Sequence, residues 1–201
     1  MTRLAVKRTY TPEEYLALER KAATKSEYVN GEIYAMAGAS REHNLIAGNL
    51  FAELRAQLRE RPCETYMSDM RVRVRPIGLY TYPDVVVVCG RPKFEDAQVD
   101  VLVNPTVIVE VLSPSTEAYD RGEKFAHYRY LESLQEYVLV AQDRMRVEHY
   151  ARLGQQWLLT AFSRPDEVLV LPSLECAVTL ADIYARVELS VEDVLVGESS
   201  Q

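Results

Sequence analysis

The order of apolar and polar positions along the chain predicts a mixture of strands and helices. Four consecutive valines, Val85 to Val88, directly follow Pro83 and Asp84. An unbroken run of this kind is typical of a strand buried on both faces, and proline is tolerated where a strand begins because it has no N–H to give the ladder. We therefore expect the Asp84 carboxylate at the start of a buried strand, where it needs a hydrogen bond, a cation or a metal ion.

A second buried strand is predicted from Val107 to Leu112, and it is apolar except for Glu110 in its middle. Asn30-Gly31 stands between two alternating runs, which is a strong signal for a hairpin. Alternating or apolar runs predict further strands in "MRVRVRP", at Glu136 to Ala141, in a hairpin from Asp143 through Tyr150, and in "WLLTAF" and "EVLVLP".

Helices are predicted in the segments between these strands. The segment from Thr11 to Glu19 begins with a cap, a proline and two acidic residues, as helices do. A long helix from about Arg41 to Arg61, capped by Ser40, carries a periodic apolar stripe on which His43 also falls, so His43 should face inward. A further helix is expected from Asp120 to about Leu134, and a last one from Thr179 to Val187.

Composition indicates one domain spanning residues 1–201, of the α/β or α+β class. The chain has 201 residues and 48% of them are hydrophobic, which is enough for a sizeable core. We expect the polar, acidic segment from 190 to 201 to be a disordered tail. The chain has neither an apolar stretch of membrane-spanning length nor the apolar core of a signal peptide, so a soluble, cytoplasmic protein is expected.

Charge and cysteine content narrow the function classes. The net charge of −7 argues against a protein that coats nucleic acid through its overall charge, so any phosphate-binding surface should be local. The three cysteines, Cys63, Cys89 and Cys176, are odd in number and widely spaced, so they suggest neither a disulfide framework nor a zinc site. We expect them to be buried apolar residues.

Asp84 and Glu110 are the main candidates for chemistry, because each interrupts a strand that is otherwise apolar. If the two strands are antiparallel neighbours, their carboxylates could share a metal ion such as Mg²⁺, which one or two carboxylates commonly hold. The alternative is structural. Glu110 would then form a salt bridge with Arg71 or Arg73, and Asp84 would cap a turn.

Lys124 and an arginine stripe complete the set of candidates. Lys124 lies close to the apolar stripe of its predicted helix, so its ammonium group could face the two carboxylates; alternatively, it buries only its stem and keeps its tip in water. Arg71, Arg73 and Arg75 alternate along one face of a strand. They could bind phosphates, or they could be charges that protect an edge strand.

Several of these segments together resemble a known family. "YPDVVVVC", "VIVEVLSPST", "YDRGEK" and "QEYVLV", together with "EYVNGEIYAMAG" and the "H" of "REHN", are similar in order and spacing to the Uma-two family of the PD-(D/E)XK nuclease superfamily. The resemblance covers about residues 10–142. It implies a restriction-endonuclease-like α+β (α/β) fold with a mixed central β-sheet flanked by helices, an N-terminal hairpin and C-terminal β additions.

The resemblance also implies roles for individual residues. Asp84, Glu110 and the Val111 carbonyl would ligate Mg²⁺ or Mn²⁺. The superfamily's usual lysine position holds Leu112, so Lys124 on the next helix is the candidate replacement. Glu27, His43 and Asp120 match recurring family positions and could line the same pocket, although His43 could equally be a core residue and Asp120 a helix cap.

The function implied is metal-dependent hydrolysis of phosphodiester bonds in nucleic acid, above all DNA, by an endonuclease that would form a homodimer to cut two strands. Two other classes stay open. One is a non-catalytic module that keeps the fold and binds nucleic acid or a partner protein. The other is a hydrolase that uses Ser113 or Ser115 with His127, which is disfavoured because the chain has no G-x-S-x-G motif.

Overall fold

The computed structural model describes residues 8–189. In chain order the elements are α1 (Pro12–Glu19), β1 (Ser26–Val29), β2 (Glu32–Ala35), α2 (Arg41–Gln57), β3 (Cys63–Met67), β4 (Arg71–Val74), the 3-10 turn η1 (Arg75–Ile77), β5 (Leu79–Thr81), β6 (Val85–Cys89), β7 (Val101–Leu102), β8 (Val107–Leu112), α3 (Glu117–Tyr119), the π-helical turn η2 (Asp120–Lys124), α4 (Phe125–Tyr128), β9 (Glu136–Ala141), β10 (Val147–Leu153), β11 (Gln156–Phe162), β12 (Val168–Leu171), β13 (Cys176–Thr179) and α5 (Leu180–Ile183).

A six-stranded mixed sheet forms the centre of the molecule, in the order β11-β10-β9-β8-β6-β3. Only β8 and β9 are parallel within it, and the helical segment α3-η2-α4 connects them. The other neighbouring strands of this sheet run antiparallel. This is the α+β architecture with a mixed sheet flanked by helices that the sequence predicts.

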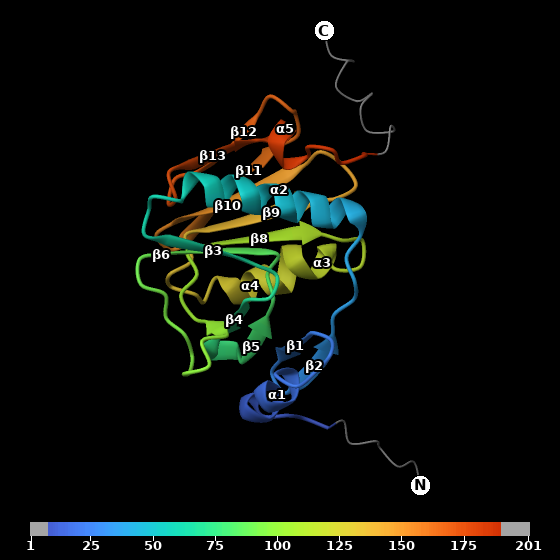
Figure 1. Ribbon diagram of the computed structural model, residues 1–201, viewed down its shortest axis with the longest axis vertical. Helices are drawn as coiled ribbons and strands as arrows, with labels where there is room; N and C mark the ends of the chain where they lie inside the picture. Colours follow the sequence, from blue (N-terminus) through green and yellow to red (C-terminus); the bar gives the residue numbers. More distant parts are fainter. Residues whose placement is uncertain (1–7, 190–201) are drawn as a thin grey trace.

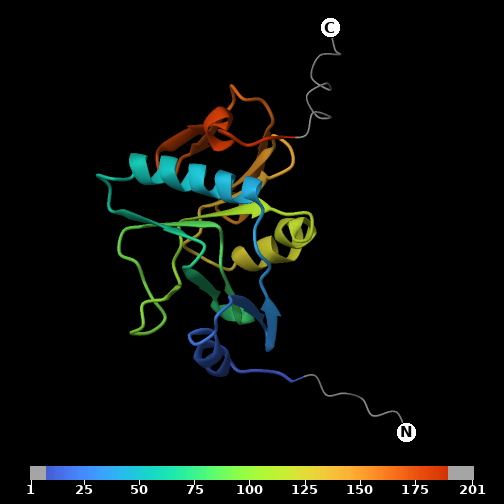
Figure 2. The ribbon, with the colours of Figure 1, turned by 45° about the vertical axis from the view of Figure 1, so that its right-hand side comes forward.

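Layers cover both faces of the six-stranded sheet (Figures 1 and 2). The helix α2, the β12-β13 pair and α5 pack on one face, and α3-η2-α4 and the smaller sheet pack on the other. Val85 and Val87 point toward the α2 layer, whereas Val86 and Val88 point toward the layer that contains α4. The uninterrupted valine run is therefore explained, because both of its faces lie in a core.

The smaller sheet has the order β2-β1-β5-β4-β7 and carries the N-terminal hairpin. Asn30 and Gly31 form the hairpin turn with φ of 43° and 97°, a region that asparagine and glycine tolerate better than other residues. In Figures 1 and 2 this sheet and α1 lie at the N-terminal end of the molecule, below the six-stranded sheet. The predicted hairpin is confirmed.

Element boundaries differ from the sequence prediction where helices end and where edge strands are short. The helix α2 ends at Gln57 rather than near Arg61, and the helix after β8 begins at Glu117 and leaves regular α geometry after Tyr128. β3 lies at a sheet edge, β5 has only three residues, and β13 pairs with β12 alone, and their sequences give no clear period. The expected tail from 190 to 201 lies outside the described residues. None of the helices in residues 8–189 is both long and apolar enough to cross a membrane.

The expectation that all three cysteines are apolar filler residues is wrong. Cys63 and Cys89 face each other across the antiparallel β3–β6 pair, with their Cα atoms 4.0 Å apart, and they form a disulfide. Only Cys176 is free and buried. The pairing could not be predicted from spacing, because the sequence around Cys63 has no pattern that sets it beside β6. Disulfides are rare in the cytosol, so this bridge is in tension with the expected cytoplasmic location.

Reduction of this bridge should lower the free energy of unfolding by about 3 kcal/mol, because the disulfide restricts the unfolded chain over a sequence separation of 26 residues. For a chain of this length that is a fall of about 6–12 °C in melting temperature. Thermal melts of oxidised protein, reduced protein and Cys63→Ser test this. Thiol titration of unfolded, unreduced protein should detect Cys176 alone; titration of all three thiols would show that the bridge does not form.

Candidate functional site

The register of β6 and β8 brings Asp84 and Glu110 to the same end of the sheet. Val85 pairs with Val109 in this antiparallel ladder, so the next step of the register sets Asp84 opposite Glu110. Residues opposite each other in antiparallel strands have Cβ atoms about 4.5–5.5 Å apart. The antiparallel pairing of these two strands, on which the sequence prediction depends, is confirmed.

Asp84 is held by the next strand and by α2. The Val111 N–H donates to Asp84 Oδ2 at 2.7 Å, and His43 Nε2 lies 3.2 Å from the same oxygen. Ser40 caps α2 and so places His43 in its first turn, facing inward as predicted. Burial lowers the pKa of His43, but the hydrogen bond and charge of Asp84, helped by the Val111 backbone, outweigh it and leave the pKa raised. His43 Nδ1 is buried and has no hydrogen-bond partner among residues 8–189.

Glu110 is among the most enclosed of the candidates. The Lys124 ammonium lies 2.9 Å from Glu110 Oε1, and the Tyr128 hydroxyl donates to that oxygen at 2.7 Å. Burial, helped by two neighbouring carboxylates, raises the pKa of Glu110 to about 8 although Lys124 pulls it down. Lys124 does not fully offset the burial because several acids share its one positive charge.

Lys124 lies at the centre of an acidic cluster. Its Nζ is 2.9 Å from Glu110, 3.3 Å from Asp120 and 3.4 Å from Glu27. Asp120 and Lys124 are the first and last residues of η2, and this π-helical turn sets both side chains on the inward side. Burial lowers the pKa of Lys124, but the surrounding carboxylates outweigh it and hold the pKa well above its ordinary value. Lys124 is therefore a buried ammonium and not a side chain with its tip in water.

Glu27 reaches the cluster from β1, in the N-terminal hairpin. The Thr81 hydroxyl on β5 donates to Glu27 Oε1, the oxygen that also faces Lys124. The side chains of Asp84, His43 and Glu27 are 15–16% exposed, whereas those of Glu110, Lys124 and Asp120 are 5–7% exposed. The cluster is thus accessible from the side of Asp84, His43 and Glu27.

The cluster has fewer cations than anions. Asp84, Glu110, Glu27 and Asp120 supply four carboxylates, against the ammonium of Lys124 and the imidazole of His43. The hydrogen bonds and close ion pairs of these two side chains engage Asp84 Oδ2 and Glu110 Oε1. Oxygen donors with spare lone pairs in a negatively charged site suit a hard divalent cation. No group of three histidine, cysteine or acidic side chains in that range forms a ready metal cage, so two carboxylates would hold the ion with water or backbone oxygen.

The raised pKa of Glu110 predicts how stability depends on pH. Between its ordinary value of 4.5 and its folded value of about 8, the folded protein binds a proton that the unfolded chain has released. The free energy of unfolding of metal-free protein should therefore fall as pH rises through this window. Thermal melts in chelator across that range measure the slope. Glu110→Gln should remove part of the fall, and identical slopes for the two proteins would contradict the raised pKa.

The arginine stripe is not gathered at this cluster. Arg71 is buried against Asp100, at 3.2 Å, and Tyr82, and Arg73 pairs with Glu95. Arg75 begins η1 and is exposed. The structural alternative in which Glu110 pairs with Arg71 or Arg73 is wrong, because its partner is Lys124.

Some contacts of the cluster had no signal in the sequence. Tyr128 and Thr81 hold Glu110 and Glu27, yet in the sequence they look like ordinary core residues. Asp120 was expected to cap a helix, but it lies within the helical segment and faces Lys124.

The serine-hydrolase alternative gains no support from the contacts of its candidate residues. Ser113 Oγ lies 3.0 Å from Ser115 Oγ and 2.9 Å from Thr116 Oγ1. His127 Nε2 lies 3.9 Å from Glu123 Oε1. Neither serine therefore has the imidazole base that a serine nucleophile requires.

Comparison with known proteins agrees with the resemblance seen in the sequence. The family model Uma2, described as "Putative restriction endonuclease", matches residues 12–182. The chain is 43% identical over 158 residues to the "Uncharacterized protein sll1609" of Synechocystis sp., covering 78% of this chain and 89% of the relative. It is 37% identical over 175 residues to "Uncharacterized protein slr1290" of the same organism, covering 87% and 90%.

A solved structure has the same fold. It is the crystal structure of a "putative nuclease belonging to DUF820" from Anabaena variabilis, with a TM-score of 0.73 at 20% sequence identity. The match covers 87% of this chain and 97% of that chain. At this identity the likeness establishes the architecture alone.

Proposed function

This chain belongs to the Uma2 family of restriction endonuclease-like proteins, and from that premise we propose that it hydrolyses phosphodiester bonds of DNA with the help of Mg²⁺ or Mn²⁺. We propose Asp84 and Glu110 as the metal ligands, with the Val111 carbonyl as a third. Lys124 is proposed to act on the substrate phosphate. A homodimer is proposed as well, because cutting both strands of a duplex requires two such sites.

One observation carries the proposal: three carboxylates converge on the single ammonium group of Lys124, and Asp84 stands opposite one of them, Glu110, across the β6–β8 ladder. Like charges in a buried site repel unless a proton or a cation lies between them. In the metal-free protein Glu110 relieves this repulsion by holding a proton, since its pKa is raised to about 8. A divalent cation would take the place of that proton and allow the carboxylate to ionise.

The contacts of the cluster suggest what each side chain would do. The Val111 N–H and His43 orient Asp84, and the Tyr128 hydroxyl orients Glu110, so that both carboxylates are held before a ligand arrives. A bound Mg²⁺ would lower the pKa of its water and neutralise charge on the phosphate. Lys124 is placed to donate to a phosphate oxygen or to that water.

Metal binding should stabilise the protein measurably. At a free Mg²⁺ concentration about 100 times the dissociation constant, the free energy of unfolding should rise by about 2.7 kcal/mol. The rise should be greater at pH 8 than at pH 6, because Glu110 must lose its proton to bind, and its pKa is about 8. Melts of wild type with Mg²⁺, Ca²⁺ or chelator test this, with cleavage of supercoiled plasmid measured in parallel. Melts and cleavage that are both indifferent to chelator would overturn the proposal.

The alternative is a module that keeps the nuclease fold and binds nucleic acid or a partner without cutting. It predicts that Mg²⁺ stabilises the protein while no substrate is cleaved. The buried Lys124 beside Glu110 disfavours this alternative. A protein that only binds would be at least as stable with an apolar side chain of similar volume at this position, so a buried ammonium would bring it no advantage. Assays on duplex DNA, single-stranded DNA and RNA separate the two functions.

A further inference from the structure

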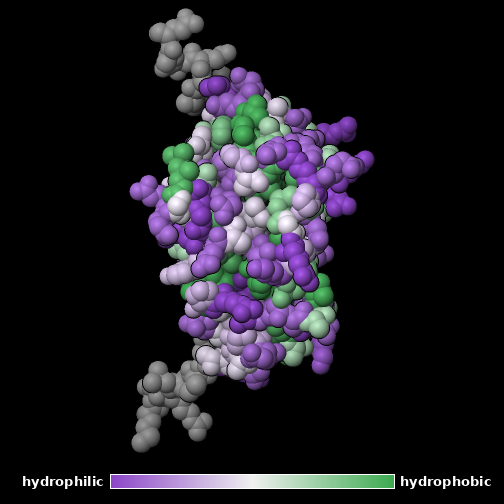
Figure 3. Space-filling view, turned by 90° about the vertical axis from the view of Figure 1, so that its left-hand side faces the viewer, coloured by the Kyte–Doolittle hydropathy of each residue, from purple (hydrophilic) through white to green (hydrophobic). Residues whose placement is uncertain are grey.

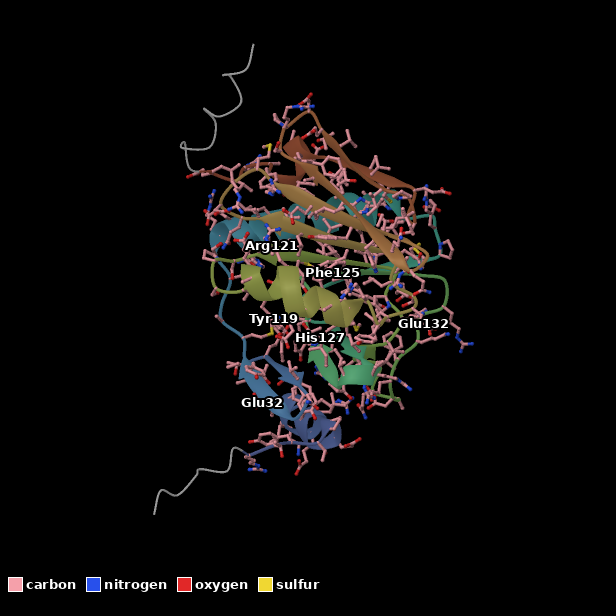
Figure 4. The ribbon with its side chains drawn as sticks, turned by 180° about the vertical axis from the view of Figure 1, so that it is seen from behind. Glu32, Tyr119, Arg121, Phe125, His127 and Glu132 are labelled. Atoms are coloured by element: carbon pink, nitrogen blue, oxygen red, sulfur yellow. A yellow bond between two sulfur atoms is a disulfide. The ribbon has the colours of Figure 1, made fainter. Side chains whose placement is uncertain are left out.

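A groove of about 280 Å³ lies away from the acidic cluster, at the far end of α4. It is formed where η1, the loop before β7 and the turn after α4 meet. Its lining residues are Arg73, Arg75, Pro76, Lys93, Val103, Asn104, Tyr130, Leu131, Glu132 and Ser133. Figure 4 shows Glu132 at the opposite end of the helical segment from Tyr119 and Arg121.

The groove brings together cations that lack acidic partners. Arg75 and Lys93 are both exposed, and neither has an ion-pair partner within residues 8–189. Arg71, Arg73 and Arg121, by contrast, all pair with carboxylates. These two cations outnumber the one carboxylate in the lining, Glu132, so the groove keeps a local positive potential on an acidic protein.

The position of Lys93 is set by the loop that carries it. The Lys93 backbone N–H donates to Asn104 Oδ1 at 2.7 Å, and its carbonyl accepts from the Val103 N–H at 3.0 Å. The Asn104 amide in turn donates to the Arg91 carbonyl at 3.2 Å. The backbone of Lys93 is therefore held in place, while its side chain stays free to bind an anion.

Arg73 adds a cation to the wall of the groove. Its guanidinium pairs with Glu95 and lies 5.1 Å from the centroid of the Tyr80 ring, yet its Nε is buried without a hydrogen-bond partner in the described part of the chain. Buried donors are nearly always paired, so an unpaired one calls for an explanation. A phosphate in the groove would give this guanidinium a second anionic partner.

An aromatic ring completes the groove. Tyr130 is 58% exposed, which is high for a large ring, and it comes just after Arg129, the residue that caps the end of α4. Figure 3 views the molecule from the side on which α4 ends in Figure 1, and shows a mainly hydrophilic face with small, separate apolar patches. An exposed ring beside unpaired cations is the combination that binds single-stranded nucleic acid, in which bases stack on rings and phosphates contact cations.

We propose that this groove binds a single-stranded segment of nucleic acid, with Arg75 and Lys93 contacting phosphates and Tyr130 stacking on a base. The inference rests on the proposed nuclease function, because it assigns a second contact surface to the same substrate. It extends the proposed substrates to nucleic acid that carries an unpaired segment, such as a flap, an overhang or a single strand. Of the three arginines predicted to bind phosphates, this proposal assigns that role to Arg75. Arg71 instead is buried and pairs with Asp100 and Tyr82.

The test measures binding separately from cleavage. Every variant is made in a Glu110→Gln background, and the anisotropy of a fluorescent single-stranded oligodeoxynucleotide is followed over a range of salt concentrations. Arg75→Ala and Lys93→Ala should each reduce the slope of log affinity against log salt by about 0.7, as for one lost phosphate contact on a single strand. Tyr130→Ala should weaken single-strand binding by about tenfold and leave duplex binding unchanged, and Tyr130→Phe should restore it.

Arg59→Ala is the matched control, since Arg59 is an exposed arginine that follows α2, on the opposite face of the six-stranded sheet. It should change neither the affinity nor the salt slope. The groove assignment is overturned if Arg59→Ala has the same effect as Arg75→Ala, if Tyr130→Ala weakens duplex binding equally, or if the oligonucleotide does not bind. None of these outcomes bears on metal-dependent cleavage by wild type, so failure of the groove and failure of the proposed function are distinguishable.

Discussion

Glu110→Gln should abolish metal-dependent cleavage while leaving the fold intact. The amide keeps the shape of the side chain and can still accept hydrogen bonds from Tyr128 and Lys124, which lie 2.7 and 2.9 Å from Glu110 Oε1. It loses the negative charge that would hold the metal ion. We expect turnover to fall by at least about 10³-fold, equivalent to about 4 kcal/mol of transition-state stabilisation.

The measurement is the initial rate of plasmid cleavage at saturating Mg²⁺. Glu123→Gln is the matched control, because Glu123 stands on the same helical segment and its side chain is 65% exposed. This control should retain wild-type activity. A Glu110→Gln protein that cuts at the wild-type rate would remove Glu110 from the proposed site.

Lys124→Met should lower turnover by about 10³-fold and affect metal affinity far less, because an ammonium group is not a ligand for a cation. The same change should destabilise the metal-free protein by about 3–5 kcal/mol, since it leaves the carboxylates of Glu110, Asp120 and Glu27 buried without their cation. Mg²⁺ should recover part of that loss. Turnover should therefore be compared at saturating metal and at a temperature where the variant is folded.

Two further variants separate the chemical from the structural role of Lys124. Lys124→Arg keeps the charge, so it should recover most of the lost stability but little of the turnover, because a planar guanidinium cannot take the position of an ammonium. Lys25→Met removes a lysine that pairs with Asp69 outside the cluster, and it should leave turnover unchanged. If metal binding collapsed in Lys124→Met while turnover per bound metal survived, Lys124 would serve structure alone.

The buried strands could be predicted from sequence because a strand buried on both faces has a continuous run of apolar residues. Val85 to Val88 are all apolar, and the run from Val107 to Leu112 is apolar except at Glu110. A charged residue beside or within such a run is therefore conspicuous. His43 and Lys124 could be expected to face inward because helical periodicity sets them beside apolar stripes. The sequence leaves open whether the two strands are neighbours, and the structure shows their antiparallel pairing.

The contacts that depend on tertiary structure could not be predicted in the same way. Tyr128 and Thr81 carry no signal that separates a residue holding a carboxylate from any other core residue. The π-helical turn that aligns Asp120 with Lys124 has no sequence signature, so Asp120 resembled a helix cap. The Cys63–Cys89 bridge required knowledge of a strand pairing in which one member is a short edge strand.

The central claim is that Asp84 and Glu110 hold a divalent metal ion together. Crystals of the wild-type protein soaked in Mn²⁺, with diffraction recorded near the manganese absorption edge, test it most directly. An anomalous peak between the two carboxylates, within about 2.0–2.6 Å of an oxygen of each, is the predicted result. That peak should vanish in crystals of Glu110→Gln soaked in the same way. Manganese bound elsewhere in the crystal, with no peak between Asp84 and Glu110 and with Lys124 still paired to Glu110, would contradict the claim.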